Sequence, residues 1–197
     1  DDRNLLYVRI DRKRKFLATT FLRALGLDSD EDILKTFYKV STITVDRKKL
    51  YWLLDDSLVG KKIGKNINEP GKARKVLVSA GRKITNAAFT TLKKARVKRV
   101  EIGIEDVEGS FSSTDIVDPA SGEVLVEANS QVTGGIVNSL FEAKVKALSI
   151  FFPDLDDVGE TLSNSLQRDW VENTNDALIE IYRKQRPGDP PTIDTAT

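Results

Sequence analysis

Two short charged clusters hold the side chains of this sequence that could do chemistry. Residues 9–15 carry five cations around a single acid, Asp11, and residues 154–157 carry three aspartates. Closely spaced cations neutralise phosphate groups and release counterions, which is how proteins hold DNA without reading its sequence. Closely spaced carboxylates hold Mg²⁺ for phosphoryl or nucleotidyl transfer. Each cluster also has an interpretation without a ligand. Residues 9–15 could be the basic end of a strand, and residues 154–157 could be a solvated acidic loop.

The composition limits the kinds of enzyme that the chain could form. Its 197 residues include no His and no Cys, which removes the commonest general base and every thiolate zinc site. With no base placed near residues 154–157, we expect neither a metal ion nor a catalytic residue. No apolar run approaches the length of a membrane span and no signal-like segment is found, so no membrane contact is expected. The first residue is Asp1 rather than Met, which suggests a piece of a longer protein.

Charge is sharply segregated along a chain whose net charge is only +1. Residues 61–100 hold 13 Lys and Arg against one acid, Glu69, whereas residues 101–130 hold 8 acids and no base. Such blocks create opposite local fields on a nearly neutral molecule. They are either solvated faces or a surface for a partner, and the sequence leaves both open.

The middle of the chain contains an internal repeat. Residues 76–102 align without a gap with residues 124–150, and most of the identical residues are Val, Leu and Ala. Each copy predicts a short apolar strand, a turn, a helix with Thr85 or Thr133 as its N-cap, and a second strand. Units of this size do not bury their apolar faces alone, so the copies are expected to pack together or against a shared sheet.

The remaining segments carry ordinary helix and strand signals, which together predict an α+β fold. A helix over residues 17–25 is expected to end at Gly26, and Ser29 with Asp32 resembles a capping box for a second helix. Trp52 and Trp170 have apolar neighbours and are expected to be core or inter-domain anchors. The other expected elements are a strand over 5–10, hairpins over 42–54 and 111–127, and helices over 162–168 and 174–186, the last capped by Thr174.

Two stretches near opposite ends of the chain are more specific than these patterns. Residues 7–15 read Tyr-Val-Arg-Ile-Asp-Arg-Lys-Arg-Lys, and residues 172–191 predict a helix that ends in Pro-Gly-Asp-Pro-Pro. Both resemble flanking parts of the lobe of the bacterial RNA polymerase β subunit. The resemblance implies a partial lobe domain in two segments, residues 1–27 and 151–197. An inserted domain over residues 28–150, which contains the repeat, would interrupt it.

The resemblance also implies roles for both charged clusters. In that family this part of the lobe lines the main channel beside the non-template strand. Asp11, Arg12 and Arg14 are therefore expected to be DNA-proximal, with Asp11 near a pocket for an unstacked guanine. Residues 153–161 resemble the gate loop at the tip of the lobe, a docking point for an elongation factor. The residues expected to form this docking loop are Pro153, Asp154, Asp156 and Asp157.

By resemblance, the chain is a scaffold and channel wall of a bacterial DNA-directed RNA polymerase, cytoplasmic and associated with the nucleoid, with no activity when isolated. The implied partners are the β′, α and σ subunits, DNA and elongation factors. No cofactor is expected in this fragment, because the catalytic Mg²⁺ of the family belongs to β′. An alternative is a stand-alone interaction module that binds nucleic acid or an acidic protein through its basic face. A parent reading frame that continues on both sides into a polymerase β subunit would distinguish the two.

Overall fold

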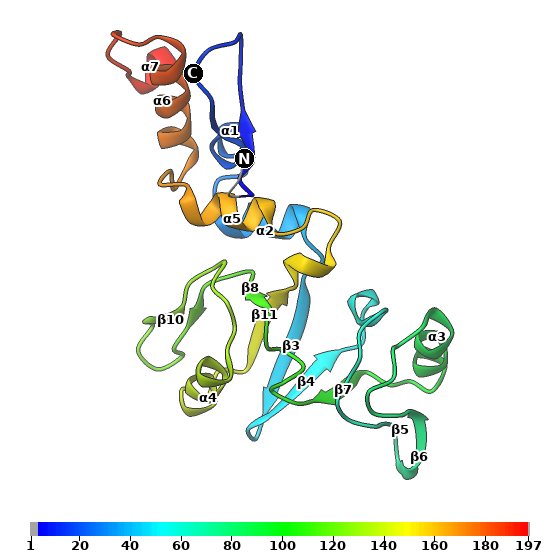
Figure 1. Ribbon diagram of the computed structural model, residues 1–197. Helices are drawn as coiled ribbons and strands as arrows, with labels where there is room; N and C mark the ends of the chain where they lie inside the picture. The colour runs from blue at the N-terminus through cyan, green and yellow to red at the C-terminus, as the bar shows by residue number, and fades with distance from the viewer. Residues whose placement is uncertain (1–3, 197) are drawn as a thin grey trace. The chain divides into compact units, whose positions relative to one another are not determined.

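The computed structural model describes residues 4–196, except for the side chains of residues 72–74, and the chain forms two compact units. Unit 1 comprises residues 1–38 and 152–197, and unit 2 comprises residues 39–151 (Figure 1). The observed boundary after Tyr38 differs from the expected one after residue 27, because helix α2 (Asp30–Phe37) belongs to unit 1. Residues 1–3 and 197 of the two expected lobe segments lie outside the described part of the chain.

Unit 1 is mainly helical, and its local signals match those in the sequence. Gly26 takes a positive φ of 106° after α1, and the Ser29–Asp32 capping box opens α2. The N-cap of α6 is Asn173 rather than the expected Thr174, because the Asn173 side chain accepts from the N–H of Asp176. The elements besides α2 are β1 (Tyr7–Val8), β2 (Phe16–Leu17), α1 (Ala18–Ala24), η2 (Pro153–Leu155), α5 (Thr161–Arg168), α6 (Thr174–Gln185) and α7 (Ile193–Ala196).

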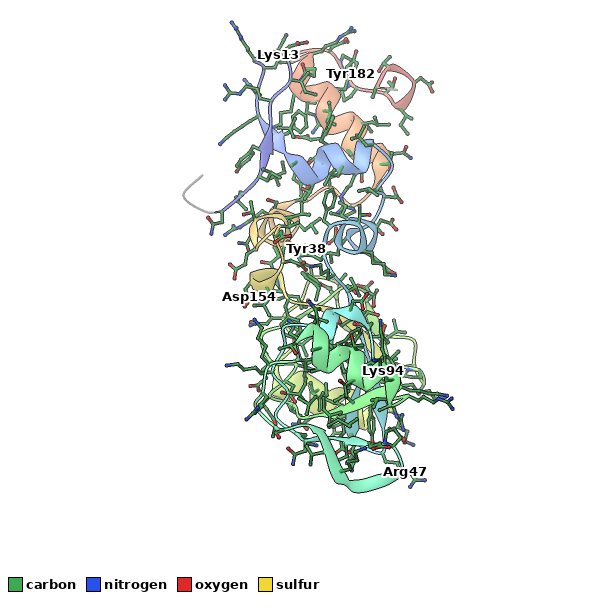
Figure 2. The ribbon with its side chains drawn as sticks, turned by 90° about the vertical axis from the view of Figure 1, so that its right-hand side faces the viewer. Lys13, Tyr38, Arg47, Lys94, Asp154 and Tyr182 are labelled. Carbon is green, nitrogen blue, oxygen red and sulfur yellow. The ribbon has the colours of Figure 1, made fainter. Side chains whose placement is uncertain are left out.

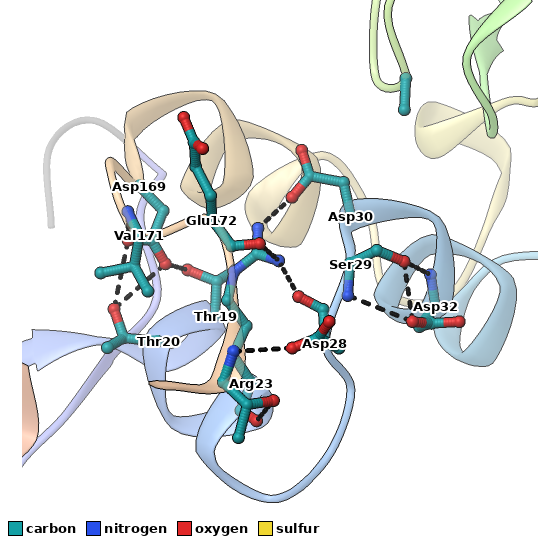
Figure 3. A network of polar contacts seen from close by, with 12 residues as sticks. Thr19, Thr20, Arg23, Asp28, Ser29, Asp30, Asp32, Asp169, Val171 and Glu172 are labelled. Carbon is teal, nitrogen blue, oxygen red and sulfur yellow. Dashed lines mark hydrogen bonds and ion pairs between the residues drawn. The ribbon is translucent and has the colours of Figure 1, made fainter. Parts of the chain in front are cut away.

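A buried arginine joins the two chain segments of unit 1 (Figure 3). Arg23, in the last turn of α1, is only 2% exposed. Its guanidinium donates to the carbonyl oxygens of Asp28 (2.6 Å) and Glu172 (3.2 Å) and pairs with the carboxylate of Asp30. A buried cation is tolerated when hydrogen bonds and a counter-charge replace water in this way. One side chain thus connects α1, the start of α2 and the segment that leads into α6.

Two further contacts close the same junction. The hydroxyls of Thr19 and Thr20, on α1, both donate to the carboxylate of Asp169. The carboxylate of Asp28 accepts the backbone N–H of Thr174 at 2.7 Å, and this hydrogen bond lowers the pKa of Asp28 below its ordinary value. The carboxylate form of Asp28 is therefore the form that the folded junction prefers.

Unit 2 is built on a five-stranded antiparallel sheet in the order β7-β4-β3-β11-β8. Trp52 lies on β4 opposite Ile43 of β3 and Val100 of β7, and it is 1% exposed, as expected for a core anchor. The strands of this sheet are β3 (Ser41–Asp46), β4 (Lys49–Leu53), β7 (Arg99–Ile102), β8 (Phe111–Ser112) and β11 (Ala147–Phe151). Outside it are η1 (Asp56–Leu58), the pair β5 (Ile67–Glu69) and β6 (Lys72–Val78), α3 (Asn86–Lys94), the pair β9 (Ile116–Val117) and β10 (Val124–Val126), and α4 (Gly134–Glu142).

The two aligned stretches have the same elements at matching positions. Helices α3 and α4 follow Thr85 and Thr133, whose hydroxyls accept the backbone N–H of the third residue on. Each helix is followed by a left-handed residue, Arg96 (φ 58°) or Lys144 (φ 56°), and then by a strand of the shared sheet.

The expected second hairpin is shorter than residues 111–127, because β8 is not part of it and pairs with β11 instead. Among the described helices none is long and apolar enough to cross a membrane.

Equivalent core positions of the two copies are expected to be equally sensitive to truncation. Leu92 and Leu140 are buried to 0% and 1% exposure, so replacing either by Ala should lower the free energy of unfolding by about 2–5 kcal/mol. Urea unfolding can be followed by the fluorescence of the buried Trp52. Thr90→Ala, on the exposed side of α3, is the control. A cost below about 1 kcal/mol at one position alone would contradict the equivalence.

Acid is expected to weaken the junction of unit 1. A carboxyl group whose pKa is lowered by folding stabilises the folded state above its unfolded pKa, and this contribution is lost as pH falls through the folded pKa. The pKa values of Asp28 and Asp32 are both lowered, so thermal stability should fall below about pH 4. Asp28→Asn should make that fall less steep, whereas Asp194→Asn on α7 should not. If the melting temperatures of the parent and of Asp28→Asn fell equally steeply with pH below about pH 4, the role of Asp28 would be refuted.

Candidate functional site

The expected DNA-proximal residues lie in the turn between β1 and β2. The backbone N–H of Lys13 donates to the carbonyl of Ile10 at 2.9 Å, and the two residues between them, Asp11 and Arg12, have φ values of 49° and 57°. Positive φ at both central residues is typical of a type I′ turn. The strand expected over residues 5–10 is reduced to Tyr7–Val8, so the cations project from a tight turn rather than along a strand.

The five cations of this turn divide into two that are engaged and three that are available. The Lys13 ammonium donates to the carbonyl of Gln185 at 3.4 Å, at the end of α6, where the helix dipole favours a cation. The Lys15 ammonium lies 3.9 Å from the centroid of the Tyr7 ring, which attracts it electrostatically. Within the described residues, the side chains of the other three cations, Arg9, Arg12 and Arg14, are exposed and form no hydrogen bond, ion pair or ring contact.

The structure therefore adds Arg9 to the predicted pair of arginines. Arg9 directly follows β1, Arg12 lies within the turn, and Arg14 lies in the segment that leads to β2. Arg9 belongs to the same charged cluster in the sequence, but only the separation into engaged and available cations identifies it. Three guanidinium groups on one exposed turn form a surface suited to phosphate, because guanidinium matches phosphate geometry with paired hydrogen bonds.

The expected docking loop begins with the short helix η2. Pro153 is buried, Asp154 and Asp157 are exposed, and Asp156 is half-buried. The side chain of Leu155, between these acids, is 62% exposed. Within the described residues no group of three or more His, Cys, Asp or Glu side chains is placed so that it could hold a metal ion. The loop presents two exposed carboxylates around one exposed apolar side chain.

Tyr38 anchors the far end of this loop. Its hydroxyl donates to the carbonyl of Gly159 at 2.8 Å and accepts the backbone N–H of Ser163 at 3.0 Å. That N–H belongs to the first turn of α5, whose own N-cap residue, Glu160, makes no side-chain cap. Tyr38 thus caps α5 from the end of α2, and its burial raises the pKa of the phenol. No local pattern in the sequence indicates this role, since its partners lie more than a hundred residues away.

The two surfaces lie at opposite ends of unit 1. The turn with Lys13 lies beside the end of α6 near Tyr182, whereas Asp154 and Tyr38 lie at the other end, beside α2 and α5 (Figures 1 and 2). A compact ligand cannot contact both. Unit 1 therefore has one basic and one acidic surface, at its two ends.

Removing the Tyr38 hydroxyl should loosen the docking loop. Tyr38→Phe keeps the buried ring but leaves the Gly159 carbonyl and the Ser163 N–H without their partner, at a cost of about 1–3 kcal/mol. We expect faster hydrogen exchange at the start of α5 and faster proteolysis within residues 153–160. The control is Tyr182→Phe, which removes an exposed hydrogen bond to Asp189. Unchanged exchange at Ser163 in Tyr38→Phe would contradict the anchoring role.

The chain was compared with known proteins, and no protein-family model matches it. Over its whole length the chain is similar to three proteins named DNA-directed RNA polymerase subunit beta. They come from Solibacter usitatus (strain Ellin6076; 48% identity over 197 residues), Koribacter versatilis (strain Ellin345; 48% over 203 residues) and Sorangium cellulosum (strain So ce56; 38% over 198 residues). The chain spans 14% of the length of each of these relatives.

Proposed function

Because the chain belongs to the family of DNA-directed RNA polymerase β subunits, of which it is one segment, we propose that unit 1 is part of the lobe that lines the DNA channel. The observation that carries this proposal is the set of three exposed guanidinium groups, Arg9, Arg12 and Arg14, on the β1–β2 turn. Phosphate groups of the DNA backbone supply the counter-charge that the described residues do not. Asp11, at the tip of the same turn, lies beside the DNA strand in this proposal.

Contacts of this kind hold and orient DNA, and they carry little sequence information. The chain thus contributes a wall of the channel to a nucleotidyltransferase and no group that reacts. In the assembled enzyme its partners are the β′, α and σ subunits, and the catalytic Mg²⁺ is held by β′. Unit 2 is the inserted domain of this lobe.

The acidic surface has a different role in the proposal. The loop over residues 153–161 docks an elongation factor through Leu155, with Asp154 and Asp157 flanking it. A central apolar side chain with charged neighbours is the usual arrangement of a small protein interface. The factor that fits this surface carries an apolar pocket with cations at its rim. Tyr38 holds the loop in one conformation, which reduces the entropy lost on docking.

The arginine contacts are testable in the complete polymerase. Arg12→Ala/Arg14→Ala should shorten the lifetime of promoter open complexes similarly at different sequences, because the lost contacts are to phosphate. If two phosphate contacts are removed, the dependence of log affinity on log salt should become less steep by about 1.8. Lifetimes at several promoters give the first quantity, and equilibrium binding across a salt series gives the second.

The matched control is Lys13→Ala/Lys15→Ala. It removes the same charge from the same turn, but from side chains that are already engaged by Gln185 and Tyr7. The control should leave the salt dependence close to that of the parent. Lifetimes and slopes of Arg12→Ala/Arg14→Ala that equal those of the parent would remove the DNA-proximal assignment.

A further inference from the structure

The duplication in unit 2 extends upstream of the aligned residues. In this upstream part the two copies have the same backbone arrangement but differently charged side chains. In the first copy Lys62 lies opposite Lys83 in an antiparallel bridge, and in the second copy Phe111 lies opposite Gln131. The backbone hydrogen bonds on either side of the bridge also match. In the first copy the N–H of Ile84 donates to the carbonyl of Lys61 (2.8 Å) and that of Gly81 to Ile63 (2.8 Å). In the second copy the N–H of Val132 donates to the carbonyl of Ser110 (2.7 Å) and that of Asn129 to Ser112 (2.7 Å). The same framework therefore carries a lysine pair in one copy and a neutral pair in the other.

The lysine pair is unfavourable in the isolated chain. The bond from Ile84 to Lys61 flanks the bridge, so Lys62 and Lys83 form the narrow, non-hydrogen-bonded kind of pair, in which side chains lie closest. Like charges directly opposite each other in this position destabilise an antiparallel pair. Because the second copy builds the same bridge from Phe111 and Gln131, the fold does not require charge here. The two lysines are thus explained by something other than folding.

No neighbouring acid relieves this repulsion. Some cations of unit 2 are paired with acids, among them Lys49–Glu101 (3.2 Å), Lys65–Glu101 (2.9 Å), Lys93–Asp56 (3.3 Å) and Arg99–Asp46 (3.3 Å). Among residues 4–196, by contrast, no acidic side chain pairs with Lys62, Lys83 or the adjacent Arg82, and all three are exposed. No acidic side chain within the described part of unit 2 therefore offsets the charge of the bridge.

We propose that Lys62 and Lys83 contact phosphate groups of a nucleic-acid backbone. An ammonium group is a compact point charge that binds phosphate without demanding a fixed orientation. A protein partner fits less well, because protein interfaces centre on an apolar or aromatic anchor. Here Ile63 and Ile84 are both buried, so the segments on either side of the bridge expose charge and no large apolar side chain. This contact is separate from the one proposed for the arginines of unit 1.

The test uses the complete polymerase and the double variant Lys62→Gln/Lys83→Gln, since Gln already occupies one position of the equivalent bridge. Its equilibrium binding to duplex DNA, measured from about 50 to about 200 mM salt, should show a slope of log affinity against log salt that is less steep by about 1.8. Its thermal stability should be equal to or above that of the parent, because a repulsive pair has been removed. The matched control, Lys49→Gln/Lys93→Gln, removes the same charge from lysines that are already paired, and its slope should equal that of the parent.

A second measurement identifies the partner directly. A photocrosslinking amino acid at position 83 of the polymerase should capture DNA or RNA in a transcribing complex. Crosslinks to protein alone would overturn the proposal and assign the bridge to an acidic protein partner. A parental salt slope for Lys62→Gln/Lys83→Gln, or a loss of thermal stability in that variant, would also overturn it.

Discussion

The buried positive charge of Arg23 is the constraint on which unit 1 depends. The chain leaves unit 1 after Tyr38 and returns at Phe152, so no short covalent link holds its two segments together. Arg23 replaces that link, because its guanidinium is withdrawn from water and is stable only while Glu172, Asp28 and Asp30 surround it. Separating the segments would leave this charge buried without partners or force it into water. The positions of α1 and α6, and hence of the arginine turn beside them, follow from this contact.

The availability of each charge, rather than the number of charges, distinguishes the surfaces of this protein. Lys13 and Lys15 stand in the same turn as Arg12 and Arg14, yet the carbonyl of Gln185 and the ring of Tyr7 already occupy them. In unit 2 the same division separates Lys49 and Lys93, which are paired, from the lysine bridge. A cation that has no partner within its own unit retains the greatest gain from an external phosphate, since no internal contact is lost on binding.

The duplication shows which features of a sequence a fold requires. Between the copies, the buried leucines, the threonine N-caps and the left-handed residue after each helix recur, because these determine where the helix starts, packs and stops. The bridge residues do not recur: the exposed Lys62 and Lys83 of the first copy are replaced by the half-buried Phe111 and the exposed Gln131 in the second. A module that repeats its backbone and changes its surface charge can therefore take a new partner without a change of fold.

The sequence by itself determined the features that depend on near neighbours. The α+β class, the helices after Thr85 and Thr133, the capping box at Ser29 and the clustering of cations at residues 9–15 all arise from contacts or periodicities within a few residues. Only the tertiary structure decided the boundary after Tyr38 and the separation of engaged from available cations. It also decided the position of Trp170, whose apolar neighbours in the sequence suggested an anchor but whose side chain is 62% exposed. It also revealed the cap that Tyr38 provides for α5 and the pairing of Lys62 with Lys83. These features depend on groups that are distant in the chain, and local sequence patterns do not report which distant groups will meet.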